Sequence, residues 1–330
     1  MERKSSMKAL QLQGINQLVE VSVPVPRPGK DEVLIRTQAA TICTSDLHDL
    51  KSNPFGIAYP RIMGHEGSGV IVECGAEVMD LPPGTRVASH PVIPCRQCEE
   101  CLRGYDHLCL NMSHLGIDKD GCFAEYFVLR ADRVRAIPDH LPFPLAALLE
   151  PVAVCLQAIA RAGEVGGKRV LIVGDGPFGN IIARLANRAG AATVVVSGRE
   201  PFRLAKIPGV DITYDPPADF FDIAILAVSA ADTVNICLEA LRPRGRLVIF
   251  STINEPVSLS LFKLHVKELE MVGACNDEHK IEESLAYLTQ ETAAFQDIIT
   301  HQIPFSNWQD AFVLAADKHD EALKVAINFN

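Results

Sequence analysis

The stretch that decides the fold of one half of the chain is Lys168-Arg169-Val170-Leu171-Ile172-Val173-Gly174-Asp175-Gly176-Pro177-Phe178-Gly179. The apolar run that ends at Val173 is rich in β-branched residues and has the length of a strand. Apolar residues then recur at helical spacing until Gly190. A glycine-rich turn between a strand and a helix lets the backbone approach a pyrophosphate, which rests on the helix N-terminus. The pattern therefore predicts a dinucleotide site formed by Gly174, Gly176, Pro177, Phe178 and Gly179.

Strands and helices continue to alternate after this turn. We expect strands at residues 192–197, 221–228 and 246–251, and a helix at residues 232–241. Strands that alternate with helices indicate a parallel, doubly wound α/β sheet of the Rossmann type. We place this domain at residues 154–292.

The residues after the second strand bear on which dinucleotide is bound. An NAD site carries an Asp or Glu there for the ribose 2′-hydroxyl, whereas this chain has Gly198, followed by Arg199 and then Arg203. A missing carboxylate removes repulsion, and the two guanidinium groups could hold a 2′-phosphate. NADP is therefore favoured over NAD. Glu200 keeps NAD open, and both arginines could instead be ordinary solvated charges.

Four of the ten cysteines lie close together, namely Cys95, Cys98, Cys101 and Cys109. A closed zinc site needs four thiolates about 2.3 Å from one ion, and two-residue gaps let a short loop supply them. Pro94 and Gly104 favour the turns that such a loop requires. A closed site stabilises a loop and performs no chemistry. We favour structural zinc over an iron–sulfur cluster or four unrelated thiols.

A second set of potential ligands is more widely spaced. Cys43 is followed by His65 and Glu66 in the stretch Gly64-His65-Glu66-Gly67, and Glu150 precedes an apolar, helix-like run. Each residue alone is more often an ordinary hydrogen-bonded or solvated side chain. Together they match a catalytic zinc site, in which three protein ligands leave one position open. Such an ion lowers the pKa of a bound hydroxyl.

Composition narrows the class of protein. The chain has 330 residues, 48% of them apolar and 22% charged, which favours two soluble domains. Its net charge is −10, so nucleic acid and anionic membranes are not expected partners. No secretory signal or membrane-length apolar run is visible. We expect a cytoplasmic protein with reduced thiols.

The first 150 residues contain short candidate strands separated by Gly and Pro, at 33–37, 69–74, 86–89 and 123–128. This pattern indicates an all-β, barrel-like domain that carries both proposed metal sites. We expect a further strand at residues 323–328 to pair with it. We therefore assign residues 1–153 plus about 293–330 to one discontinuous domain, with the cysteine lobe at about 90–112.

With these motifs in place, the chain resembles the zinc-containing medium-chain dehydrogenase/reductase family over nearly its whole length. The resemblance rests on Cys43 with Ser45 and His48, the GHE at 64–66, the four-cysteine lobe, the GxGxxG at 174–179 and the run GCFAEYFVLRADRVRAIP at 121–138. Within the family, Glu150-Pro151 resembles the polyol (sorbitol-type) branch, with threonine dehydrogenases close by.

The resemblance implies a GroES-like domain, a Rossmann domain and two zinc ions. It implies a catalytic zinc on Cys43 and His65, completed by Glu66, Glu150 or both. Ser45 and His48 would form a proton path from the substrate hydroxyl, although His48 could instead have a structural role. It also implies a homodimer or homotetramer.

The expected reaction is reversible oxidation of a secondary alcohol to its ketone, with hydride transfer to the nicotinamide. The substrate would be a polyol, sugar or sugar derivative. Threonine-like amino alcohols are the alternative, and a non-catalytic cofactor-binding member is the other class. The polyol branch usually has an arginine in the stretch matching residues 272–277, and none is present here, which counts against sorbitol itself.

Overall fold

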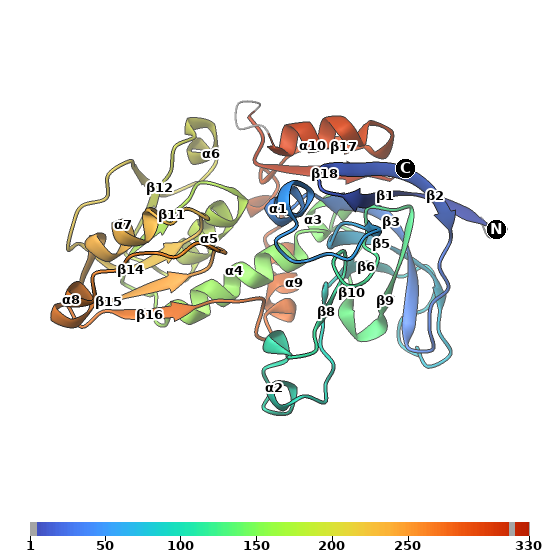
Figure 1. The fold of residues 1–330 in the computed structure, drawn as a ribbon, viewed down its shortest axis with the longest axis horizontal. Coiled ribbons are helices and arrows are strands. Elements are labelled where there is room, and N and C mark those ends of the chain that lie inside the picture. Colours follow the sequence, from blue (N-terminus) through green and yellow to red (C-terminus); the bar gives the residue numbers. More distant parts are fainter. Residues whose placement is uncertain (1–4, 317–320, 330) are drawn as a thin grey trace. The chain divides into compact units, whose positions relative to one another are not determined.

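The computed structural model describes residues 5–316 and 321–329, and it divides the chain into two compact units (Figure 1). The first unit comprises Met1–Glu150 with Ile281–Asn330, and the second comprises Pro151–Lys280. The first is therefore discontinuous in sequence. Each unit has its own sheets and its own buried core.

The second unit is built on a six-stranded parallel sheet of order β13-β12-β11-β14-β15-β16. This is the strand order of the doubly wound dinucleotide-binding fold, so the predicted Rossmann sheet is confirmed. The strands are β11 (Arg169–Val173), β12 (Thr193–Ser197), β13 (Asp211–Thr213), β14 (Phe221–Leu226), β15 (Leu241–Ile249) and β16 (Glu270–Gly273).

Helices precede or follow these strands along the chain. They are α4 (Leu149–Ala162, which begins at the end of the first unit), α5 (Pro177–Arg188), α6 (Pro201–Ala205), α7 (Thr233–Ala240) and α8 (Leu261–Val266). The central strands are buried on both faces, as the nearly continuous apolar sequences of β11 and β14 require. Leu171, Phe221 and Leu247 are completely buried in the core of this unit.

Two strands of this sheet escaped prediction. β13 and β16 are short and largely exposed, and neither carries the apolar run that marks β11 or β14. Their place in the sheet comes from pairing with longer neighbours, which a local sequence pattern does not encode.

The first unit is mainly antiparallel, and β3 (Glu32–Thr41) is its centre, since it pairs with three other strands. Its larger sheet has the order β10-β6-β5-β3-β18-β17, with β9 also paired to β3. A three-stranded sheet, β2-β1-β4, and the pair β7-β8 complete it. The strands besides β3 are β1 (Ser6–Gly14), β2 (Gln17–Pro24), β4 (Arg61–Ile62), β5 (Glu66–Cys74), β6 (Arg86–Ser89), β7 (Val92–Ile93), β8 (Ser113–His114), β9 (Tyr126–Arg130), β10 (Val134–Ala136), β17 (Ile299–Pro304) and β18 (Lys324–Asn328).

The helices of the first unit are short. They are α1 (Thr44–Ser52), α2 (Glu99–Leu102), α3 (Phe143–Ala146), α9 (Ile281–Gln290) and α10 (Trp308–Ala316), with single 3₁₀ turns at Asp106–Leu108, Ala131–Arg133, Thr292–Ala294 and Phe305–Asn307. The predicted barrel-like part built on β-strands is confirmed, and the structure adds these helices to it. The predicted C-terminal strand is β18, which pairs antiparallel with β3.

Within the described residues, one stretch is long and apolar enough to cross a membrane, namely Phe143–Ala162. It contains α3 and α4, and 78% of it is buried inside the protein. Its apolar character therefore belongs to a core helix.

Candidate active site

A thiol, an imidazole and a carboxylate converge in the first unit. Potential ligand atoms of Cys43, His65 and Glu66 all lie within 4.8 Å of one another, and all three residues are buried. Cys43 is the residue that precedes α1, whereas His65 and Glu66 stand at the start of β5. The cis Tyr59-Pro60 bond and β4 lie just upstream of that start. This donor set fits a zinc ion with room for a further ligand.

Asp46 orients two of these groups, and sequence analysis missed it. Its Oδ2 accepts a hydrogen bond from the backbone N–H of Cys43 at 2.8 Å, and its Oδ1 lies 3.3 Å from Nδ1 of His65. Metal-binding imidazoles commonly engage a carboxylate in this way, which leaves Nε2 for the metal. Its position three residues after Cys43, as in a capping box, is the signal that could have revealed it.

The His65 imidazole is electrostatically coupled to this carboxylate. Burial lowers the pKa of His65, but the charge and hydrogen bond of Asp46 and the nearby Cys43 raise it more, so that the net pKa lies well above its usual value. A metal at Nε2 must displace a proton. Zinc affinity at this site should therefore fall as the pH falls.

Glu66 is held by two buried partners. The Thr41 hydroxyl donates to its Oε2, and the Lys324 ammonium lies 2.7 Å from Oε1 and 2.6 Å from Oε2. Glu66 is 0% exposed and Lys324 is 2% exposed. Lys324 comes from β18, so the C-terminal strand places a cation beside the cluster.

The other three residues predicted for this site, Ser45, His48 and Glu150, lie at different places relative to the Cys43–His65–Glu66 cluster. The Ser45 hydroxyl lies 3.4 Å from Nε2 of His65, next to the cluster. His48 is on the exposed side of α1, three residues after Ser45. Glu150 is buried and acts electrostatically on Lys324, but it is not among the three residues whose ligand atoms converge.

His114 is a second residue near this centre that the sequence analysis did not select. Its ring lies 5.4 Å from that of His65, edge to face. Burial lowers the pKa of His114 to about 3, with a further contribution from the charge of His65, so this imidazole is neutral. It packs beside His65 without adding charge.

The four lobe cysteines converge as predicted. Their sulfur atoms lie within 4.8 Å of one another, and Sγ of Cys98 and Cys109 are 3.8 Å apart. Four sulfurs about 2.3 Å from a tetrahedral ion would have a similar separation. The backbone N–H of Gln97 lowers the pKa of Cys95 to about 6, with help from that of Cys98, which favours a thiolate. Gly104, at φ +87°, makes the return turn.

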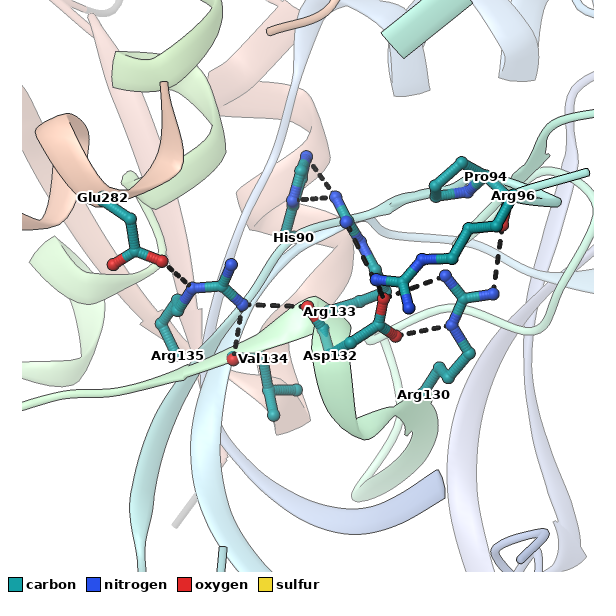
Figure 2. Close-up of polar contacts among 9 residues, drawn as sticks. All are labelled: His90, Pro94, Arg96, Arg130, Asp132, Arg133, Val134, Arg135 and Glu282. Atoms are coloured by element: carbon teal, nitrogen blue, oxygen red, sulfur yellow. Dashed lines mark hydrogen bonds and ion pairs between the residues drawn. The ribbon is translucent and has the colours of Figure 1, made fainter. Parts of the chain in front are cut away.

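Arginines around Asp132 connect this lobe to the sheet (Figure 2). Arg130 donates to the carbonyl oxygen of Pro94 at 3.0 Å and forms an ion pair with Asp132. Arg96, from the lobe itself, also pairs with Asp132. Burial raises the pKa of Asp132, but these arginines outweigh it and the net pKa is lowered. The Asp132 carboxylate thus helps to hold the start of the cysteine loop, at Pro94 and Arg96, against the sheet.

The glycine-rich turn has the form that a dinucleotide requires. Gly174 has φ +124°, and a Cβ on it would lie 2.7 Å from the carbonyl oxygen of Ala227. A Cβ on Gly179 would lie 2.0 Å from the carbonyl oxygen of Gly174, so α5 packs closely there. A Cβ on Gly176 would meet nothing within 4 Å, so the backbone is open to a ligand. Pro177 opens α5, and the Phe178 ring lies 5.3 Å from that of Phe250.

Contrary to what the sequence around Gly198 suggests, the end of β12 does not lack a carboxylate. Asp175, from the glycine-rich turn, accepts hydrogen bonds on Oδ2 from the backbone N–H groups of Arg199 and Glu200, the second at 2.8 Å. A Cβ on Gly198 would lie 2.5 Å from this carboxylate. Arg199 is exposed, and Arg203 lies on α6. A carboxylate is therefore present at this end of the strand after all.

Comparison with known proteins places both units in one family. Residues 29–139 match the alcohol dehydrogenase GroES-like domain, and residues 177–290 match the zinc-binding dehydrogenase domain. L-threonine 3-dehydrogenase of Pyrococcus furiosus is 34% identical over 320 residues, covering 90% of this chain and 91% of the relative. L-galactonate-5-dehydrogenase of Escherichia coli K12 is 30% identical, covering 98% of this chain and 100% of the relative.

Solved structures agree with this grouping. A zinc-binding dehydrogenase from Sinorhizobium meliloti 1021 bound to NADP superposes with a TM-score of 0.91 at 28% identity, covering 98% of this chain and 100% of that one. An alcohol dehydrogenase from Escherichia coli CFT073 with NADH gives a TM-score of 0.92 at 26% identity, covering 99% and 100%. Both dinucleotides therefore occur among similar structures.

Proposed function

Because this chain belongs to the zinc-containing medium-chain alcohol dehydrogenase family, and is a zinc-dependent NAD(P) dehydrogenase, we propose that it interconverts a secondary alcohol and its ketone. The observation that carries the proposal is the convergence of Cys43, His65 and Glu66 beside Asp46. A protein that had kept only the fold and the dinucleotide would have no need of this buried set.

The side chains divide the work as follows. Cys43 Sγ and His65 Nε2 would hold zinc, with Glu66 as the third ligand and Glu150 as the alternative to it. Zinc bound there would act as a Lewis acid that lowers the pKa of the substrate hydroxyl, and the nicotinamide would accept the hydride. Asp46 fixes the tautomer and orientation of His65.

The proton from the substrate hydroxyl needs a path to solvent. Ser45 Oγ lies 3.4 Å from His65 Nε2, so it is well placed to take that proton. His48 lies three residues further along α1 and is exposed, so it could pass the proton on. We assign these two residues to the relay.

The pattern Glu150-Pro151 supports a polyol, sugar or sugar-derived alcohol as the substrate. The identity to L-galactonate-5-dehydrogenase is consistent with this class. The alternative is a threonine-like amino alcohol, which is favoured by the 34% identity to L-threonine 3-dehydrogenase. We also propose that the protein is cytoplasmic, because all ten cysteines are free. We propose a homodimer or homotetramer, because the family relationship suggests assembly.

The dinucleotide is NAD or NADP. Arg199 and Arg203 support a 2′-phosphate, as the sequence suggests. The Asp175 carboxylate supports a ribose 2′-hydroxyl.

An absorbance assay of the reduced nicotinamide tests the function. Zinc-replete protein would be given a panel of polyols, sugar alcohols, aldonates and amino alcohols, with NAD⁺ and NADP⁺ in parallel. Turnover with a polyol or aldonate supports the proposal, and turnover only with threonine-like compounds supports the alternative. Absence of turnover despite bound zinc and dinucleotide would contradict both.

A further inference from the structure

We propose that Asp175 supplies the carboxylate that receives the adenosine ribose, so that this chain selects NAD(H) against NADP(H). The inference rests on the family-level assignment of a nicotinamide dinucleotide to this unit. It assigns a role to a residue of the glycine-rich turn that the sequence pattern leaves unspecified. It also replaces the reasoning from Gly198 that favoured NADP.

The Asp175 carboxylate lies beside the end of β12. In dinucleotide folds the acid that binds the ribose 2′-hydroxyl is carried by the end of the second strand. Here that strand is β12, and the residue after it is Gly198. A Cβ on Gly198 would lie 2.5 Å from both Cβ and Oδ2 of Asp175. The Asp175 side chain therefore fills the space where the side chain of residue 198 would begin.

Two backbone hydrogen bonds hold that carboxylate. The backbone N–H groups of Arg199 and Glu200 both donate to Oδ2 of Asp175. Two such donors fix the orientation of the carboxylate. Both bonds use the same oxygen, and a carboxylate has acceptor capacity on each of its two oxygens. Oδ1 can thus accept a hydroxyl while Oδ2 remains tied to the turn.

A ligand can reach the Asp175 carboxylate, and the charge of this group distinguishes a hydroxyl from a phosphate. Asp175 is partly exposed, and the neighbouring Gly176 would have open space around a Cβ, so a ligand can approach this turn. A ribose 2′-hydroxyl can donate to the carboxylate. A 2′-phosphate would bring two like charges together within a few ångströms. Arg199 is exposed, and its backbone rather than its guanidinium contacts Asp175.

The residues also explain why position 198 is a glycine. Its backbone is not in the left-handed region, so the conformation does not demand glycine. The requirement is steric and comes from Asp175. The pair Asp175 and Gly198 is thus a carboxylate moved from the strand to the preceding turn.

The inference is tested without turnover by measuring how tightly the purified protein binds NADH and NADPH. Nicotinamide fluorescence reports the binding. We expect the wild type to bind NADH at least about tenfold more tightly than NADPH. Asp175→Asn should weaken the binding of NADH and strengthen the binding of NADPH. The ratio of the two affinities should change by about tenfold or more. Glu200→Gln, which removes the neighbouring charge, should leave the ratio unchanged.

A swap of the two residues controls for damage to the turn. Asp175→Gly should lose the NADH preference, and Gly198→Asp should bind poorly because its side chain would meet Asp175. The double variant Asp175→Gly/Gly198→Asp should recover the preference, since it returns the acid to the strand. Thermal unfolding of each variant separates lost binding from lost folding.

Three results would overturn the inference. Tighter NADPH binding by the wild type would do so, and would return Arg199 and Arg203 to the 2′-phosphate. A ratio altered by Glu200→Gln but not by Asp175→Asn would assign the ribose to Glu200. Failure of the wild type to bind either nucleotide would overturn the cofactor assignment as well, so the two failures are distinguishable.

Discussion

Lys324 Nζ lies 2.7 Å from Oε1 of Glu66, and both side chains are buried. Burial lowers the pKa of Lys324, but the charge of Glu66, with Cys43 and Glu150 nearby, raises it more, so the net pKa is raised and the ammonium is charged. The cation balances the carboxylate beside the proposed zinc. β18 therefore contributes to the site as well as to the sheet.

Lys324→Met should be strongly destabilising, because it leaves the buried Glu66 carboxylate without its cation. Breaking one partner of a buried pair typically costs about 3–5 kcal/mol. The matched control is Lys30→Met, which breaks the exposed Lys30–Glu77 pair at 2.9 Å and should cost far less, because solvent screens that pair. Denaturant unfolding measures both. Equal costs would show that the buried pair has no special role.

Asp46→Asn should lower the zinc affinity of the Cys43–His65 site by about 10- to 100-fold, because the variant loses the carboxylate that orients His65. Competition with a chelator measures the affinity, and the cysteine lobe in the same molecule is the internal control. Loss of both zinc ions together would instead indicate general misfolding.

Gly176→Ala and Gly179→Ala should fail in different ways. A Cβ on Gly176 meets nothing within 4 Å, so the variant should fold normally and lose dinucleotide affinity. A Cβ on Gly179 would lie 2.0 Å from the Gly174 carbonyl oxygen, so that variant should be unstable. Thermal unfolding and NADH binding separate the two. A stable Gly179→Ala protein would contradict the packing described for α5.

Asp49 should make stability depend on pH. Burial raises the pKa of Asp49 to about 6 from 3.8, although the N–H of Phe55 opposes the shift. The folded state then binds a proton that the unfolded state releases, so stability falls as the pH rises from 3.8 to about 6. Asp49→Asn removes this loss. Its unfolding temperature relative to wild type should increase across that window, and a constant difference would refute the shift.

Much of this architecture was predictable because its signals are local. The strand–glycine–helix pattern around Gly174 and the spacing of the lobe cysteines each encode their structure within a few residues. The approach of Cys43 to His65 has no local signal, because twenty-two positions separate them, so it was predicted from the ligand chemistry of the two side chains together with the family resemblance. Residues that act through a neighbour were harder to find. Asp46, Lys324 and Asp175 look like ordinary surface charges until the fold places them.

The measurement that tests the central claim most directly is the zinc content of the purified protein and of its Cys43→Ala variant. Wild type should contain two zinc ions per chain, one for each cluster. Cys43→Ala should lose one of them while the cysteine lobe keeps the other. One zinc in the wild type, or two in the variant, would contradict a zinc centre at Cys43, His65 and Glu66.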